Sequence, residues 1–151
     1  MISNQSDYYG GLATRLGASI IDGLAVYIVS GAVENFLKLS MGASLLFSLI
    51  VGFLYYCVIQ AKFKGTYGKH VMGLLVLDED TLEPMTIKQS FKRYSMEFVS
   101  VICLGIGVLS IGWHEKHQSW HDRSAKTVVV KKEHLNELMK KVHLINSSRP
   151  L

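Results

Sequence analysis

Three long apolar runs dominate the pattern of hydrophobic and polar positions along the chain. They cover residues 16–33, 39–61 and 98–113, and Asp22 is the single charged residue inside them. A helix that rises 1.5 Å per residue needs about 20 residues to cross the hydrocarbon core of a bilayer. The pattern therefore predicts a small bundle of three apolar helices, in which the second run is clearly long enough to cross a membrane.

Two other interpretations of these runs agree less well with the sequence. One is the buried helical core of a soluble domain, but the middle run is too long and too uniformly apolar for a small core. The other is a signal peptide, but the first run carries Asp22 near its centre and follows a single basic residue, Arg15. We therefore expect an all-α integral membrane protein with several passes through the cell membrane.

Two short segments outside the apolar runs have the composition of β-strands. Residues 74–77 and 127–130 are tetrads of β-branched or aliphatic side chains, and we expect them to pair at the cytoplasmic membrane surface. Between these segments, Thr86 is placed to cap a helix that begins near Ile87.

The C-terminal part of the chain has a different pattern. Between residues 133 and 144, apolar residues recur with helical spacing beside basic ones, which predicts a short amphipathic helix. The sequence leaves open whether this helix lies on the membrane or on the protein. We divide the chain into a membrane domain at residues 1–131 and a basic amphipathic tail at residues 132–151.

The basic residues are distributed unevenly along the chain. Of the 16 Lys and Arg residues, two lie in the first 61 positions, six between residues 62 and 93, and eight between residues 116 and 149. Cytoplasmic segments near membrane helices are enriched in Lys and Arg, which places the 62–93 segment and the N-terminus in the cytoplasm. A third helix that crosses would put eight basic residues outside. The alternative is a helical hairpin broken at Gly105 and Gly107, and both arrangements stay open.

The pair Arg15 and Asp22 is the clearest candidate for a polar site. Seven residues of helix bring the two side chains to one face, about 10 Å apart along the axis. A charged Asp near the middle of a membrane costs roughly 2.5–3.5 kcal/mol, so Asp22 must face the bundle interior or be protonated. Two interpretations remain: a structural clamp that accepts hydrogen bonds from a neighbouring helix, or a proton or cation site.

Two further segments carry candidate residues. Asp122 is either a partner for Arg15 or a cap for the turn that follows it. The stretch from Gly65 to Lys69 has a superficial likeness to a phosphate loop, but its glycine spacing is wrong and His70 replaces the required Ser or Thr. We interpret it as a turn with an interfacial lysine that meets lipid phosphates.

Three histidines, His114, His117 and His121, follow one another at spacings of three and four, which on a helix would form a zinc or copper set. Together with Trp113 and Trp120 they more often mark a membrane boundary. We therefore expect no metal site. The sequence offers no catalytic constellation, so we also expect no enzyme activity, no cofactor and no nucleic-acid partner.

The sequence resembles the RDD family of membrane proteins, which is named for one Arg and two Asp residues. The first signature is Arg-x6-Asp, seen as Arg15 and Asp22, and the resemblance also marks Asp122. The order and spacing of the signatures cover most of the chain, with one departure, since Thr66 directly follows Gly65. The remaining signature positions are Gly65, Thr66, Gly68, Lys69, Gly73, Leu74, Val76, His121, Ala125, Thr127 and Val129.

Two classes of function remain open, and the resemblance implies the first of them. Some members of the family are associated with cation/proton antiport, which would make Asp22 the titrating group and the lipid bilayer, monovalent cations and protons the partners. Three short helices do not easily surround a pathway, so such a transporter would be a homo-oligomer. The alternative is a non-transport accessory, scaffold or assembly protein of the membrane.

Overall fold

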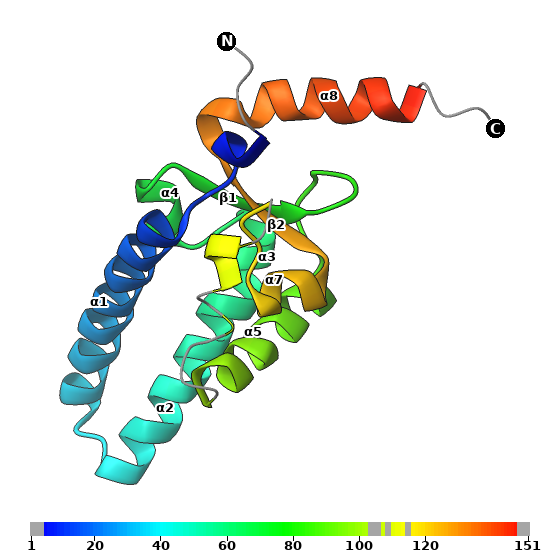
Figure 1. Cartoon of the computed structure of the whole chain (residues 1–151). Helices are drawn as coiled ribbons and strands as arrows, with labels where there is room; N and C mark the ends of the chain where they lie inside the picture. The colour runs from blue at the N-terminus through cyan, green and yellow to red at the C-terminus, as the bar shows by residue number, and fades with distance from the viewer. Residues whose placement is uncertain (1–4, 103–106, 108–109, 114–115, 148–151) are drawn as a thin grey trace.

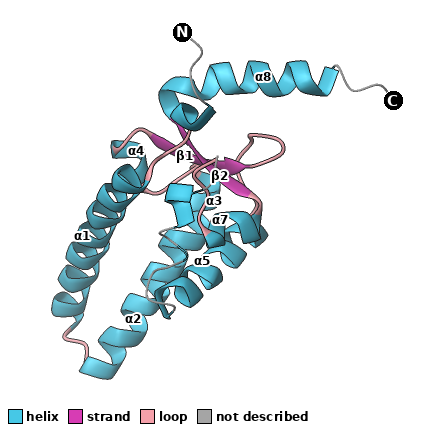
Figure 2. Ribbon diagram, in the orientation of Figure 1, coloured by secondary structure: helices cyan, strands magenta, loops and turns pink. Residues whose placement is uncertain are grey.

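The computed structural model describes residues 5–102, 107, 110–113 and 116–147 of the chain. It is mostly helical, with one small antiparallel sheet of two strands (Figures 1 and 2). The elements in chain order are η1 (Gln5–Tyr8), α1 (Leu12–Leu37), α2 (Met41–Phe53), η2 (Leu54–Ile59), α3 (Gln60–Lys62), α4 (Tyr67–Val71), β1 (Leu74–Asp78), α5 (Ile87–Ile102), η3 (Ser110–Trp113), α7 (Trp120–Ala125), β2 (Thr127–Lys131), η4 (Lys132–His134) and α8 (Leu135–Ser147).

The first two apolar runs form a helical hairpin. Helix α1 has 26 residues, and α2 continues through the π-helical η2 into α3, which makes one helix of 22 residues from Met41 to Lys62. Both helices are long and apolar enough to cross a membrane by length and composition. Because α1 continues to Leu37, past the end of its apolar run at residue 33, and ends at the left-handed Lys38 (φ 50°), the link between the helices is short.

The long helices direct their polar residues inward and their apolar residues outward. The buried residues of α1 include Arg15, Asp22 and Ser30. None of the residues of α2 is buried, and Leu45 is 65% exposed. Helix α5 repeats the arrangement, because its polar face is buried and its apolar side chains, Phe98 among them, are exposed. This distribution is the reverse of an ordinary soluble helix.

The sheet lies between the end of the helical hairpin and α8 (Figure 1). Strands β1 and β2 pair antiparallel, with Val76 opposite Val129, as the two tetrads predicted. The alternation of side chains gives the sheet two buried faces. One face, with Leu75, Leu77, Val128 and Val130, packs on Tyr8, Tyr9 and Leu138 of α8. The other face, with Leu74, Val76 and Val129, packs on Ala61 and Met85.

Helix α5 begins where the sequence predicted. Thr86 and Gln89 form a reciprocal cap, in which the Thr86 backbone N donates to Gln89 Oε1 at 2.8 Å and the Gln89 backbone N donates to Thr86 Oγ1 at 3.3 Å. Each bond satisfies a backbone donor that the helix start would otherwise leave without a partner.

The strand pairing decides between the two arrangements of the third apolar run. Because β2 pairs with β1, residues 127–131 lie at the same end of the molecule as residues 74–78. A simple third span, which would separate these strands by the length of a helix, is therefore wrong. The hairpin agrees with the pairing, although its predicted break at Gly105 lies outside the described residues.

Helix α8 packs on the protein, which is one of the two arrangements left open by the sequence. Leu138 is buried against the sheet, and Leu135 and Val142 pack beside it. The Nζ of Lys141 donates to Tyr8 Oη at 2.9 Å and lies 4.4 Å from the centre of the Tyr8 ring. The first part of the predicted basic tail is thus attached to the folded sheet.

Candidate functional site

Asp122 lies at the start of α7, where the local sequence positions it as part of a helix cap. Ser119 is the capping residue, and its Oγ accepts from the Asp122 backbone N at 3.3 Å. In return, Asp122 Oδ2 accepts from the Ser119 backbone N at 3.1 Å. The capping role that the sequence suggested for Asp122 is therefore confirmed.

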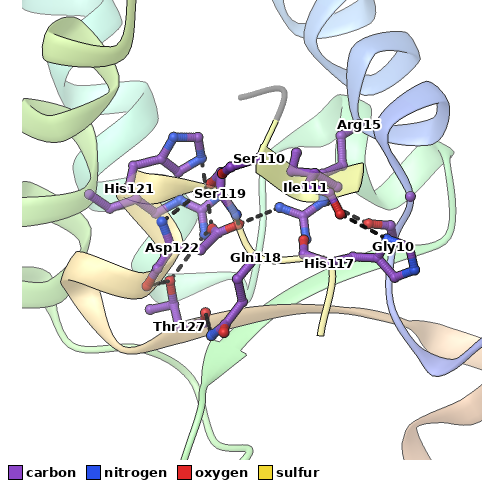
Figure 3. A network of polar contacts seen from close by, with 12 residues as sticks. Gly10, Arg15, Ser110, Ile111, His117, Gln118, Ser119, His121, Asp122 and Thr127 are labelled. Atoms are coloured by element: carbon purple, nitrogen blue, oxygen red, sulfur yellow. Dashed lines mark hydrogen bonds and ion pairs between the residues drawn. The ribbon is translucent and has the colours of Figure 1, made fainter. Parts of the chain in front are cut away.

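Arg15 reaches the same carboxylate from the first turn of α1 (Figure 3). Its Nη1 donates to Asp122 Oδ2, its Nη2 donates to the His117 carbonyl at 2.6 Å, and its Nε donates to the Gly10 carbonyl at 2.8 Å. The expected contact between Arg15 and Asp122 is present alongside the cap. The two interpretations of Asp122 were not alternatives, because one carboxylate accepts several hydrogen bonds.

Arg93 completes the site, and the sequence analysis gave it no role. Its Nη1 lies 2.5 Å from Asp122 Oδ1 and donates to Thr127 Oγ1 at 3.2 Å. A signal was available in the spacing of Ser90, Arg93, Glu97 and Ser100, which forms a polar stripe along one face of α5. Ser90 and Ser100 are fully buried, and Arg93 is 4% exposed.

The two arginines determine the charge state of Asp122, whose side chain has no exposed surface. Burial acts to raise the pKa of Asp122, but the positive charges of Arg93 and Arg15 outweigh it and hold the pKa far below its usual range. The neighbouring His121 has its Nε2 at 3.7 Å from Asp122 Oδ1. Burial lowers the pKa of His121 to about 4, against the opposing charge of Asp122, so the ring is neutral at pH 7.

Asp22 is held at a second site by three hydrogen-bond donors. Its Oδ1 accepts from Tyr55 Oη and from the Gly68 backbone N, both at 2.6 Å, and its Oδ2 accepts from Thr66 Oγ1 at 2.5 Å. Arg15 is directed to Asp122 and not to Asp22. With 1% of its surface exposed, Asp22 has the geometry of the structural clamp, since it joins α1 to η2 and to the start of α4.

Gly68 permits the close approach of α4 to α1. A Cβ at this position would lie 2.2 Å from the Ala18 carbonyl oxygen and 2.9 Å from the Asp22 carboxylate. Both distances are far shorter than van der Waals contact, so only glycine allows the backbone N of residue 68 to donate to Asp22. The stretch from Gly65 to Lys69 is therefore a turn that binds an aspartate of the same chain.

Lys69 makes a contact within the protein that the sequence did not predict. Its side chain turns inward, and its Nζ lies 3.0 Å from the Gln60 amide oxygen in the orientation that satisfies both amide atoms. Gln60 is itself 3% exposed. Burial, with help from the charge of Arg93, lowers the pKa of Lys69 to about 8.

The histidine series does not form a shared helical face. His117 lies before α7 with a left-handed backbone (φ 48°), and His121 is a buried residue of α7. His114 lies outside the described residues. Within the part of the chain that the structure describes, no group of three or more His, Cys, Asp or Glu side chains is placed to hold a metal ion.

A separate cavity of about 380 Å³ lies between α1 and α2. Ser30, Glu34, Ser48 and Tyr56 contribute polar groups to its lining. Ser48 Oγ donates to Glu34 Oε1 at 2.5 Å. Ser30 is 4% exposed, and its Oγ has no hydrogen-bond partner among the described residues.

The fold and the site define a class of small, mostly helical protein in which buried Arg–Asp contacts join apolar helices to a two-stranded sheet. The model of the RDD family matches residues 9–126, which is most of the chain, and the chain belongs to that family. This finding confirms the resemblance drawn from Arg15, Asp22 and Asp122.

Two curated relatives are similar to this chain. The "Uncharacterized protein YxaI" of Bacillus subtilis (strain 168) is 34% identical over 99 residues, which cover 65% of this chain and 64% of the relative. The "Uncharacterized protein RP437" of Rickettsia prowazekii (strain Madrid E) is 39% identical over 70 residues, which cover 46% of this chain and 38% of the relative. The chain thus spans less than two thirds of the length of each.

The contact of Arg15 with Asp122 predicts that removing the charge of either residue lowers the free energy of unfolding, and by unequal amounts. Asp122→Asn should lower the free energy of unfolding by about 3–5 kcal/mol, because it leaves both Arg15 and Arg93 buried without a counter-charge. Arg15→Gln should cost less, since Asp122 keeps Arg93. The double variant should cost clearly less than the sum of the two single changes, by at least about 1 kcal/mol. Denaturant unfolding of the purified protein in detergent measures each value.

The more exposed ion pair of Lys116 with Glu79 provides the matched control. Its Nζ–Oε1 distance is 2.6 Å, and the Lys116 side chain is 36% exposed. Lys116→Gln should cost no more than about 1 kcal/mol, as is usual for exposed pairs. Additive costs for Arg15→Gln and Asp122→Asn would show that the buried contact contributes nothing specific.

His121 predicts a pH dependence of stability. Its folded pKa of about 4 lies below the ordinary histidine pKa of 6.5, so the unfolded chain binds more protons between these values. Stability should therefore be complete above pH 6.5 and should fall by roughly 2 kcal/mol from pH 7 to pH 5. His121→Gln should flatten this dependence. Thermal unfolding at several pH values tests the prediction, and equal slopes for the parent and His121→Gln would refute it.

Proposed function

We propose that the chain is a multi-pass integral membrane protein of the cell membrane. In this arrangement α1 crosses the bilayer, and α2 through α3 crosses back. Helix α5 enters from the cytoplasmic side, and the chain returns to that side before α7. The sheet, α8 and both ends of the described chain then lie in the cytoplasm, together with the two basic segments.

The inverted distribution of polar and apolar side chains carries this proposal. A soluble core helix is mostly buried, but only 17% of the apolar window of α1 and 6% of that of the second helix are buried. The charged Arg15, Asp22 and Arg93 are buried instead. Lipid is the surrounding medium in which exposed Leu and Ile are favourable and isolated charges are not.

Within the membrane we assign the protein to a non-transport role as an accessory, scaffold or assembly subunit. Asp22 has three donors and Asp122 has two arginines, so both carboxylates are fully engaged in holding elements together. The exposed helix faces include the small residues Ser19 and Gly23 of α1, a spacing that favours close helix approach and a homo-oligomer. We assign it no enzyme activity and no cofactor.

A second candidate function, cation/proton transport, is favoured by the cavity between α1 and α2. The cavity holds the carboxylate of Glu34 and the unpartnered Ser30 Oγ, and it begins one residue beyond Asp22, at Gly23. Oxygen atoms of this kind suit a small cation. In this alternative, Asp22 would be the titrating group, and its hydrogen bonds would exchange during a cycle.

The proposed topology predicts which residues are accessible from outside the cell. In a background with Cys57 and Cys103 changed to Ala, Ser40→Cys in the turn between α1 and α2 should react with an impermeant thiol reagent in intact cells. Glu83→Cys and Lys140→Cys, both exposed positions near the sheet, should react only after the cells are opened. The protein should remain in the membrane after alkaline carbonate extraction. Labelling of Lys140→Cys in intact cells, or release by carbonate, would contradict the arrangement.

The two candidate functions predict different results in proteoliposomes. The scaffold role predicts no cation-dependent proton flux and a folded Asp22→Asn protein, because the hydroxyl of Thr66 can turn to accept from the new amide. It predicts misfolding for Asp22→Leu, which accepts no hydrogen bond. Transport predicts flux in the parent that Asp22→Asn and Glu34→Gln each abolish without loss of folding. Parent flux that survives Asp22→Asn would remove Asp22 from any transport mechanism.

A further inference from the structure

We propose that the chain binds the phosphate headgroup of an anionic lipid in a cavity beside the first turn of α1. The cavity has a volume of about 680 Å³, within the range of small-molecule sites. The site lies between α1, the start of β1 and the start of α8. The side chains that line it are Thr14, Met72, Lys131, Lys132, Glu133 and Asn136. The inference rests on the membrane location proposed above.

The charge of the cavity favours an anion. Among the described residues, no carboxylate lies within ion-pair distance of Lys131 or Lys132. The one acidic side chain of the lining, Glu133, is 71% exposed and lies 3.5 Å from His134 Nε2. Two lysines with no carboxylate partner in one cavity attract a phosphate oxygen, and the side-chain amide of Asn136 adds a donor that hydrogen-bonds to it.

The position of the cavity favours a lipid as the source of that phosphate. Thr14 lies in the first turn of the helix that we propose crosses the membrane, so the cavity lies at the level of the headgroups. Val71 and Met72, at the end of α4, are 56% and 36% exposed and provide an apolar margin beside the lysines. An open cationic cavity with an apolar margin matches a headgroup followed by the first carbons of its acyl chains.

The walls of the cavity are fixed by the fold. The Lys132 backbone N donates to the Gly73 carbonyl at 2.8 Å, which ties the start of the η4–α8 segment to the turn before β1. Gly73 has a left-handed backbone (φ 67°), and a Cβ there would meet no atom within 4 Å. The space beside this turn is therefore open while the turn itself is held, and a headgroup enters without a rearrangement of the backbone.

The assignment also changes the segment in which lipid contact is expected. The sequence placed a phosphate-binding lysine at Lys69, which the structure turns inward toward Gln60. Lys131 and Lys132 lie more than 60 residues later in the chain, and the β1–β2 pairing brings Lys131 opposite Leu74. The lysines that face the headgroups are therefore at the end of β2 and the start of η4, and Lys69 of α4 is not one of them.

Calorimetric titration of the full chain in a non-ionic detergent tests the proposal. The probes are short-chain phosphatidylglycerol, short-chain phosphatidylcholine and inorganic phosphate. We expect phosphatidylglycerol to bind at least about tenfold more tightly than either of the others. Lys131→Gln with Lys132→Gln should weaken this binding by about tenfold or more, because each lysine beside an anionic lipid contributes to the attraction. Lys88→Gln with Lys140→Gln removes the same charge from exposed positions outside the cavity and should change the affinity less than twofold.

A third variant separates binding in the cavity from general attraction to negative charge. Asn136→Phe keeps both lysines and fills part of the space, so it should also weaken the binding of phosphatidylglycerol. Unchanged affinity in Asn136→Phe, or in the Lys131 and Lys132 double variant with an unaltered thermal unfolding midpoint, would overturn the site. Inorganic phosphate that binds as tightly as phosphatidylglycerol would overturn the lipid assignment. Either failure in a protein that resists carbonate extraction would leave the proposed membrane location intact.

Discussion

The contact of one carboxylate, Asp122, with two arginines is the interaction on which the rest of the structure depends. Arg15 comes from α1, Arg93 from α5, and Asp122 itself caps α7. Strand β2 follows α7 after a single residue, so the position of the sheet depends on the same carboxylate. Asp122 is fully buried, and water does not reach it. Loss of the charge of either arginine would therefore leave the negative charge of this carboxylate only partly neutralised.

Around this contact the molecule is organised by two different kinds of core. The sheet has an ordinary apolar core on each face, made of its own Leu and Val side chains with Tyr8, Tyr9 and Leu138. The helices have a polar interior, in which Asp22 joins α1 to Tyr55 and to the turn at Thr66 and Gly68. Hydrogen bonds and ion pairs therefore hold the helices together, whereas apolar burial holds the sheet together. That division agrees with the proposal that lipid surrounds the helices.

The features that could be predicted from the sequence are those determined by neighbouring residues. Two apolar helices, the two strand tetrads and the start of α5 at Thr86 follow from composition, length and capping chemistry. The partnership of Arg15 with Asp122 came from the family resemblance. Features that depend on contacts between distant segments could not be predicted: the inward turn of Lys69, the burial of His121 and the need for glycine at position 68. Arg93 is intermediate, since its spacing from the serines of α5 marks a buried face but does not identify its partner.

The separation of these partners along the chain has a consequence for biosynthesis. Asp122 is translated 107 residues after Arg15, and Arg93 is also complete before it. Until residue 122 leaves the ribosome, the nascent chain contains two arginines that will be buried but lacks the carboxylate that contacts both of them. Helix α1 therefore cannot make its contact with Asp122 as it emerges. The contact that joins α1, α5 and α7 is completed only when the chain is almost finished, and a chain that ends before α7 lacks it.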